Sequence, residues 1–181
     1  MKILGICGSA RAKSFNAMAM HTVAGLLPAG ITFEVAKIDD LPMYHQDEQA
    51  AGFPAAAERV IAQVRAADAV LFATPEYNWS IPALLKNAID WVARAKDQPF
   101  AGKQMALMGA TIGAFGTARS QLHLRDIMIP LDGRMMNRPP VMIPQAQNKF
   151  DADGKLTDQP TMDVLKMFAA ALAEWAKAGK K

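Results

Sequence analysis

The 181-residue chain has few of the features that mark secreted, membrane-spanning or disulfide-rich proteins. Cys7 is its single cysteine, so no disulfide can form within the chain, and such cysteine usage is typical of a reducing cytosol. No apolar run approaches the ~18 residues that a membrane span needs, and the first residues lack the charged and apolar blocks of a signal peptide. We therefore expect a cytoplasmic protein without a membrane span.

Signatures of metal, triad and nucleic-acid chemistry are missing too. The three histidines, His21, His45 and His123, are scattered, and with one cysteine they form neither a metal-ligand pattern nor a catalytic triad. The formal charge of +3 is spread along the chain rather than gathered in a basic run, which argues against nucleic acid as a partner. Such a sequence favours an enzyme whose reaction is carried out by a bound cofactor rather than by its own side chains.

Apolar runs alternate with helical patterns along the chain. Strands are expected at 3–7, 31–38, 68–74, 103–110 and 135–142, and helices at 15–27, 54–66, 82–95, 118–131 and 162–178. Pro139 and Pro140 either confine the last strand to an edge or interrupt it. This alternation predicts an α/β fold, a five-stranded parallel sheet with helices on both faces, in one domain over residues 1–181.

The most informative segment is the turn between the first strand and the first helix. It gathers hydroxyl, amide and cationic side chains, namely Ser9, Arg11, Lys13, Ser14 and Asn16. Unpaired N–H groups and the helix dipole at such a turn favour a phosphate. The dinucleotide pattern G-x-G-x-x-G and the Walker A pattern are both absent, and one glycine suits a single phosphomonoester such as that of FMN. The alternative is that Ser14 or Asn16 only caps the helix.

Two further loops follow the third and fourth expected strands. Residues 74–82 combine prolines with Tyr77 and Trp79, which suits a flat aromatic ligand. The alternative is a turn whose aromatic rings belong to the core or to a subunit interface. Residues 109–119 form a glycine-bearing turn whose backbone amides could reach a ring. Because ligands bind outside the carboxyl ends of such strands, we expect the three loops to converge on one site.

These motifs carry a resemblance. Gly8-Ser-x-Arg-x-x-Ser-x-Asn16, followed by Pro75-Glu-Tyr-Asn-x-Ser-x-Pro82, resembles the NAD(P)H-dependent FMN reductase family, in particular its quinone and chromate reductase branch. The resemblance covers nearly the whole chain. It implies a flavodoxin-like fold, bound FMN, NAD(P)H as co-substrate, and a homodimer or homotetramer. It also implies transfer of a hydride through FMN to quinones or similar acceptors, such as chromate, azo compounds or free flavin.

The same resemblance implies roles for individual residues. Those expected at the FMN phosphate are Ser9, Arg11, Ser14, Phe15 and Asn16. Those expected at the flavin ring are Pro75, Glu76, Tyr77, Asn78, Thr111 and Gly113. Trp79 stands where the family pattern has tyrosine, and the 111–116 turn departs from a serine-containing one, so we expect both to bear on substrate preference. The alternative function is a flavodoxin-type electron shuttle that does not oxidise NAD(P)H directly.

Overall fold

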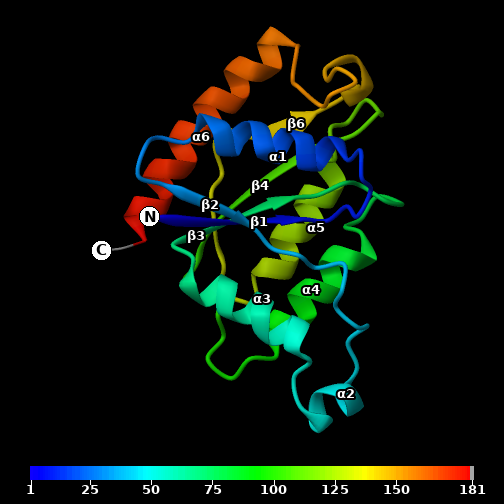
Figure 1. Cartoon of the computed structure of the whole chain (residues 1–181), viewed down its shortest axis with the longest axis vertical. Coiled ribbons are helices and arrows are strands. Elements are labelled where there is room, and N and C mark those ends of the chain that lie inside the picture. Colours follow the sequence, from blue (N-terminus) through cyan, green and yellow to red (C-terminus); the bar gives the residue numbers. More distant parts are fainter. Residues whose placement is uncertain (180–181) are drawn as a thin grey trace.

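A parallel sheet runs through the centre of the protein, and the computed structural model describes residues 1–179 of it (Figure 1). The strands are β1 (Lys2–Cys7), β2 (Thr32–Val35), β3 (Ala69–Ala73), β4 (Gln104–Ala110), β5 (Arg134–Met135) and β6 (Val141–Ile143). Their order is β2-β1-β3-β4, and β4 pairs along its far edge with both β5 and β6. The predicted α/β class, a parallel sheet with helices on both faces, is confirmed.

The expectation of five strands is wrong by one, because the segment 135–142 is not a single strand. β5 pairs with the start of β4, where Gln104 lies opposite Arg134, whereas β6 pairs with its end, where Met108 lies opposite Val141. Pro139 and Pro140 lie between the two pieces and have no N–H to donate to the ladder. Over the described residues the sheet therefore has six strands. The second strand is also shorter than the predicted 31–38.

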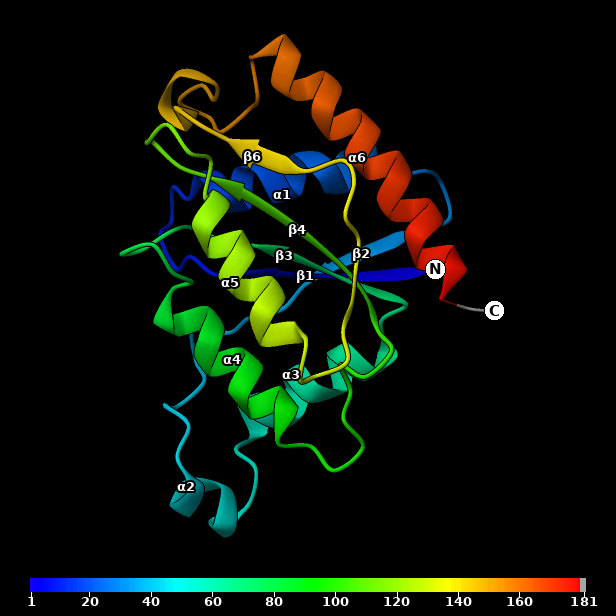
Figure 2. The same cartoon turned by 180° about the vertical axis from the view of Figure 1, so that it is seen from behind.

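Helices cover both faces of the sheet (Figures 1 and 2). On one face lie α1 (Phe15–Leu26) and α6 (Gln159–Ala178), and on the other lie α3 (Ala55–Ala66), α4 (Ala83–Ala93) and α5 (Ala118–Met128). β3 is buried along its whole length because apolar layers cover it on both sides, with Phe72 in one layer and Leu71 in the other. Such two-sided burial explains its unbroken apolar sequence.

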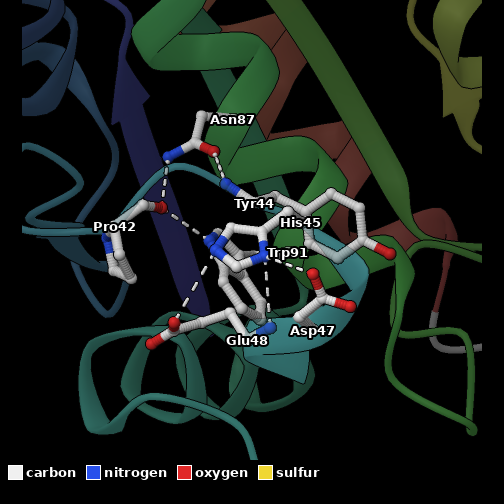
Figure 3. Close-up of polar contacts among 7 residues, drawn as sticks. All are labelled: Pro42, Tyr44, His45, Asp47, Glu48, Asn87 and Trp91. Carbon is white, nitrogen blue, oxygen red and sulfur yellow. Dashed lines mark hydrogen bonds and ion pairs between the residues drawn. The ribbon is translucent and has the colours of Figure 1, made fainter. Parts of the chain in front are cut away.

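The segment between β2 and α3 leaves the main body and carries a short helix, α2 (Gln46–Ala51), where no helix was expected (Figure 1). Its base is tied to α4 by Asn87, whose side-chain amide donates to the Pro42 carbonyl and accepts from the Tyr44 N–H (Figure 3). The indole N–H of buried Trp91 donates to the same Pro42 carbonyl. These contacts fix the position at which the segment between β2 and α3, here called the excursion, leaves the rest of the fold. A 3-10 turn at Ala146–Asn148 likewise lies outside the expected helices.

The winding of the sheet decides where a site can form. From β1 the chain moves to β2 on one side and then returns to β3 on the other side of β1, so the direction of winding reverses between β1 and β3. The loops that follow β1, β3 and β4 leave the sheet at the same end, away from the N-terminus (Figure 1). A reversal of this kind opens a crevice outside the carboxyl ends of the strands.

Candidate functional site

A cavity of about 260 Å³ opens where these three loops meet. The residues that line it are Ser9, Arg11, Ser14, Phe15, Asn16, Pro75, Glu76, Tyr77, Ala110, Thr111 and Ile112. The structure thus brings together all of the predicted site residues except Asn78 and Gly113, which lie outside the lining. Ala110 and Ile112 are additions that the sequence patterns did not single out. The expected convergence of the three loops is therefore found in the structure.

One end of the cavity is formed by the turn between β1 and α1. Ser14 is the N-cap of α1, and its Oγ accepts from the Ala17 N–H at 3.3 Å, so the capping alternative holds while the residue also lines the cavity. The Ser9 Oγ accepts from the Arg11 N–H at 3.4 Å, which keeps the turn compact. The first N–H groups of a helix have no partner within the helix, so this end offers donors and positive charge to an anion.

Gly8 allows this turn to approach the loop after β3. A Cβ atom at this position would lie 3.0 Å from Pro82 Cγ and 3.2 Å from Pro75 Cδ, closer than most such contacts. The Gly8 N–H donates to the Ala73 carbonyl at 2.9 Å. The two loops therefore pack directly on one another, and their relative placement depends on the missing side chain.

Asn16 joins the same turn to β4. Its side-chain amide donates to the Ala110 carbonyl and its Oδ1 accepts from the Ala110 N–H, both at 2.9 Å, with the residue only 4% exposed. Asn16 lines the cavity, but both ends of its amide are engaged by the strand. Its own contact with a phosphate stays a prediction, whereas its role in positioning the first turn against β4 follows from these bonds.

The other end of the cavity is bounded by a tight hairpin turn at residues 77–80. Tyr77 and Ser80 exchange both backbone hydrogen bonds at 3.0 Å, and Asn78 and Trp79 between them have φ of 50° and 66°. Two left-handed residues in succession form the primed turn that usually contains asparagine or glycine. Tyr77 and Trp79 are both exposed, so the alternative that these rings belong to the core is wrong.

The carboxylate of Glu76 turns toward α5. Its oxygens accept from the backbone N–H groups of Arg119 and Ser120 at 3.0 and 3.2 Å, and from the Arg119 guanidinium at 3.1 Å. A negative charge at a helix N-terminus is stabilised by the unpaired donors and the helix dipole. Glu76 therefore lines the cavity while its charge is balanced by α5, so its predicted contact with a flavin ring stays a prediction.

Arg119 links the two loops at this end of the cavity, a role that the sequence patterns did not reveal. Its Cζ atom lies 4.2 Å from the centroid of the Trp79 ring and 4.4 Å from that of the Phe115 ring. A guanidinium at such distances from an aromatic face is attracted by the quadrupole of the ring. The sequence places an arginine at the start of α5, but no spacing rule relates it to two rings on separate loops.

Glycines shape the turn after β4. A Cβ at Gly109 would lie 1.8 Å from Thr117 Oγ1 and 2.6 Å from the Thr74 carbonyl oxygen, so only glycine fits there. At Gly113 the nearest atom to such a Cβ would be Thr111 Oγ1 at 3.8 Å, an ordinary contact. Gly109 is therefore required by packing, whereas a side chain at Gly113 would meet no close contact.

A larger hollow, of about 410 Å³, lies beside β6 and the start of α6. Its lining is mostly apolar, and its lysine, Lys149, is already bonded to Asp158 and Thr161. The smaller cavity between the three loops instead gathers hydroxyls, helix N–H groups and Arg11. Donor chemistry rather than size therefore identifies the candidate site.

Cys7 lies at the end of β1, beside the first turn, and is partly buried. Burial raises the pKa of its thiol, although hydrogen bonds with Ser9 and Ser14 act in the opposite direction.

Within residues 1–179 no group of His, Cys, Asp and Glu side chains is arranged to hold a metal ion. Over the same residues no helix is long and apolar enough to cross a bilayer.

Comparisons with known proteins agree with this geometry. The chain is 49% identical over 177 residues to an NAD(P)H-dependent FMN reductase of Pseudomonas aeruginosa, covering 98% of this chain and 96% of the relative. It is 42% identical over 178 residues to a quinone reductase of Escherichia coli K12, covering 97% and 95%. Among solved structures, the flavoenzyme FerB of Paracoccus denitrificans, an NAD(P)H:(acceptor) oxidoreductase, superposes with a TM-score of 0.89 at 33% identity, over 98% of each chain.

The family comparison covers most of the chain. The sequence model described as NADPH-dependent FMN reductase matches residues 1–148, which include the loops after β1, β3 and β4. The resemblance inferred from the sequence motifs is confirmed by this match and by the relatives above. The protein is thus an oxidoreductase that belongs to the NADPH-dependent FMN reductase family.

Proposed function

We propose that this protein holds FMN in the cavity between the loops after β1, β3 and β4, and reduces quinones or similar acceptors with NAD(P)H. The observation that carries the proposal is the pairing of two chemistries in one cavity. The turn with Ser9 and Arg11 provides anion chemistry at one end, and the loop with Pro75 and Tyr77 provides flat apolar surface at the other. The names of the relatives, FMN reductase and quinone reductase, support the same assignment.

The side chains present fit a flavin mononucleotide. A phosphomonoester needs several donors and positive charge, and the α1 N-terminus, the Ser9 hydroxyl and the Arg11 guanidinium supply them. A fused ring system needs planar apolar contact with a few polar groups, which Pro75, Tyr77 and Ile112 provide beside the backbone of the 111–113 turn. Bound FMN supplies the hydride chemistry, accepting a hydride from the nicotinamide and passing it to the acceptor.

The role of the protein itself is to bind FMN and to keep the loops around it in place. Asn16 holds the phosphate-binding turn against β4, and Glu76 holds the loop after β3 against the start of α5. The hydrogen bonds of Asn16 and those of Glu76 each join segments that are far apart in the sequence. They therefore keep the two ends of the cavity at a set separation. Little acid–base help is needed from the chain, because the nicotinamide delivers the hydride and water would supply the proton that completes reduction of a quinone to a hydroquinone.

The proposal also concerns the chemical identity of the electron acceptor. Quinones are favoured because a quinone reductase of E. coli is 42% identical to the chain over 97% of its length. Chromate, azo compounds and free flavin are the other acceptors that should be assayed. Turnover with NADPH and with NADH should be compared for each acceptor.

The first experiment is an anaerobic visible spectrum of FMN-loaded protein before and after addition of NADPH or NADH. Rapid bleaching of the bound flavin is the expected result. Flavin that binds but stays oxidised would instead favour an electron shuttle. Failure to bind FMN would overturn the assignment of the cavity.

We further propose that the chain forms a single FMN-binding domain over residues 1–181 that assembles as a homodimer or homotetramer. Leu122 on α5 and Ile129, which directly follows that helix, are large apolar side chains that are exposed in the described chain. Exposed apolar surface of this kind is often covered by another copy of the protein. Sedimentation velocity distinguishes the monomer from the two assemblies, and a concentration-independent monomer would contradict the proposal.

A further inference from the structure

We propose that Trp79 and Phe115, held by Arg119, form a recognition platform for a planar electron acceptor at the mouth of the cavity. The inference rests on the proposed function and adds a specificity element to it. Its starting point is the stack itself, in which one guanidinium lies against the rings of Trp79 and Phe115. We call these three side chains the aromatic clamp.

The surroundings of the clamp are apolar and exposed. Tyr77 and Ile112 line the cavity, and they are 50% and 65% exposed, while Trp79 and Phe115 are 66% and 62% exposed. These four side chains come from the loops after β3 and β4 only. Isolated apolar side chains on a surface are ordinary, but four of them on two loops that line the same cavity favour binding of an apolar ligand there.

The backbone conformation of Trp79 indicates a functional role for its ring. Trp79 has φ of 66°, a left-handed conformation in which a bulky residue costs roughly 1–2 kcal/mol compared with glycine. Strain of this kind persists where the surrounding structure compensates for it, and it is found most often at functional sites. Here the compensation includes the Arg119 stack, which holds the indole on the same tight turn as Tyr77, a residue of the cavity lining.

Arg119 is suited to hold the rings because its own position is set by several bonds. Its backbone N–H and its guanidinium both bond to Glu76, at 3.0 and 3.1 Å, and Glu76 lines the cavity. The guanidinium is thereby held at a place where it contacts both rings. A lysine could keep the ion pair with Glu76 but offers no plane to stack.

The chemistry of the clamp fits a quinone. A quinone is planar and apolar over most of its surface, with carbonyl oxygens at its edge. Trp79 and Phe115 offer aromatic contact with the ring, and the adjacent Arg119 charge favours electron-rich oxygens. Arg119 is in this scheme a positioning residue, and Trp79 and Phe115 determine acceptor preference.

The test measures quinone binding without turnover. Menadione is titrated into the oxidised FMN-loaded protein in the absence of NAD(P)H, and its Kd is obtained by isothermal titration calorimetry. Arg119→Lys and Trp79→Ala should each raise the Kd for menadione about tenfold, the usual effect of losing an aromatic or cation–π contact. The Kd for FMN should change less than twofold. In steady state the KM for menadione should rise by the same factor, with kcat nearly unchanged.

Matched variants separate this role from a general structural one. Arg94 also lies over an aromatic ring, 5.2 Å from the centroid of Tyr44, but outside the cavity lining, so Arg94→Lys should leave the Kd for menadione at the wild-type value. Trp79→Tyr should restore most of the binding that Trp79→Ala loses.

Unchanged menadione binding in Arg119→Lys would overturn the inference, and so would an equal loss of FMN and menadione affinity. Wild-type protein that takes up no FMN would overturn the proposed function and this inference together. That result is visible in the flavin spectrum before any quinone is added, so the two failures are distinguishable.

Discussion

The two ends of the cavity are built in different ways. The end with the β1–α1 turn comes from the contiguous residues 8–16, whose donors are set by the start of one helix. The opposite end is assembled from the loops after β3 and β4, joined through Glu76 and Arg119 at the start of α5. The first end can be recognised in a short stretch of sequence. The second exists only when two segments that are far apart in the sequence have packed together.

The largest effect is expected at the ring end, from Gly109→Ala. The added Cβ would lie 1.8 Å from Thr117 Oγ1 and 2.6 Å from the Thr74 carbonyl oxygen, so backbone must move. We expect a loss of about 3 kcal/mol or more in the free energy of unfolding, measured by urea denaturation. Gly113→Ala, whose new Cβ makes only an ordinary contact with Thr111 Oγ1, should change the free energy of unfolding by less than about 1 kcal/mol. Equal stability of the two variants would contradict this account of the turn.

Asn16→Ala breaks the connection between the first turn and β4. Two buried hydrogen bonds are lost and both polar groups of Ala110 are left unpaired, which should cost about 3 kcal/mol in unfolding free energy. FMN affinity should fall as well, because the turn loses its anchor.

Asn87→Ala is the matched control for Asn16→Ala. Asn87 is also buried and bonded to two backbone groups, but it ties the excursion that carries α2 rather than the cavity (Figure 3). It should therefore lower stability similarly and leave the Kd for FMN unchanged. If Asn16→Ala also left FMN binding unchanged, Asn16 would have no role in positioning the turn.

Arg11→Ala probes the phosphate end alone. Loss of one charged hydrogen bond should weaken FMN binding by about 2 kcal/mol, measured by titration of the apoprotein. Lys13 is an exposed cation on the same turn that lies outside the cavity lining, so Lys13→Ala should have a much smaller effect. Similar losses in the two variants would mean that general charge attraction, rather than a direct contact, holds the phosphate.

Trp79→Gly gives the smallest expected change in stability and separates strain from recognition. Glycine adopts the left-handed φ of 66° without cost, so the free energy of unfolding should stay level or rise by about 1 kcal/mol despite the lost stacking. The KM for menadione should rise as in Trp79→Ala. A clear loss of stability in thermal or urea denaturation would show that the indole serves the fold more than the acceptor.

Much of the architecture was predictable because it depends on local pattern. The alternation of apolar runs and helical segments gave the sheet and its covering helices, and Pro139 with Pro140 signalled the break that separates β5 from β6. The excursion with α2 was not predictable, since it depends on contacts of Asn87 and Trp91 with a carbonyl more than 40 residues away. A polar residue within a helical pattern gives no indication of such a partner.

The sequence by itself determined the phosphate end of the site, because a strand, a short polar turn and a helix N-terminus are adjacent in the chain and each forms by local rules. It also indicated which loops would meet. Only the tertiary structure decided that the Asn16 amide would bond to Ala110, that Glu76 would cap α5, and that Arg119 would lie against two rings. These choices depend on distances between segments that the packing of helices on the sheet sets, and no periodicity in the chain encodes them.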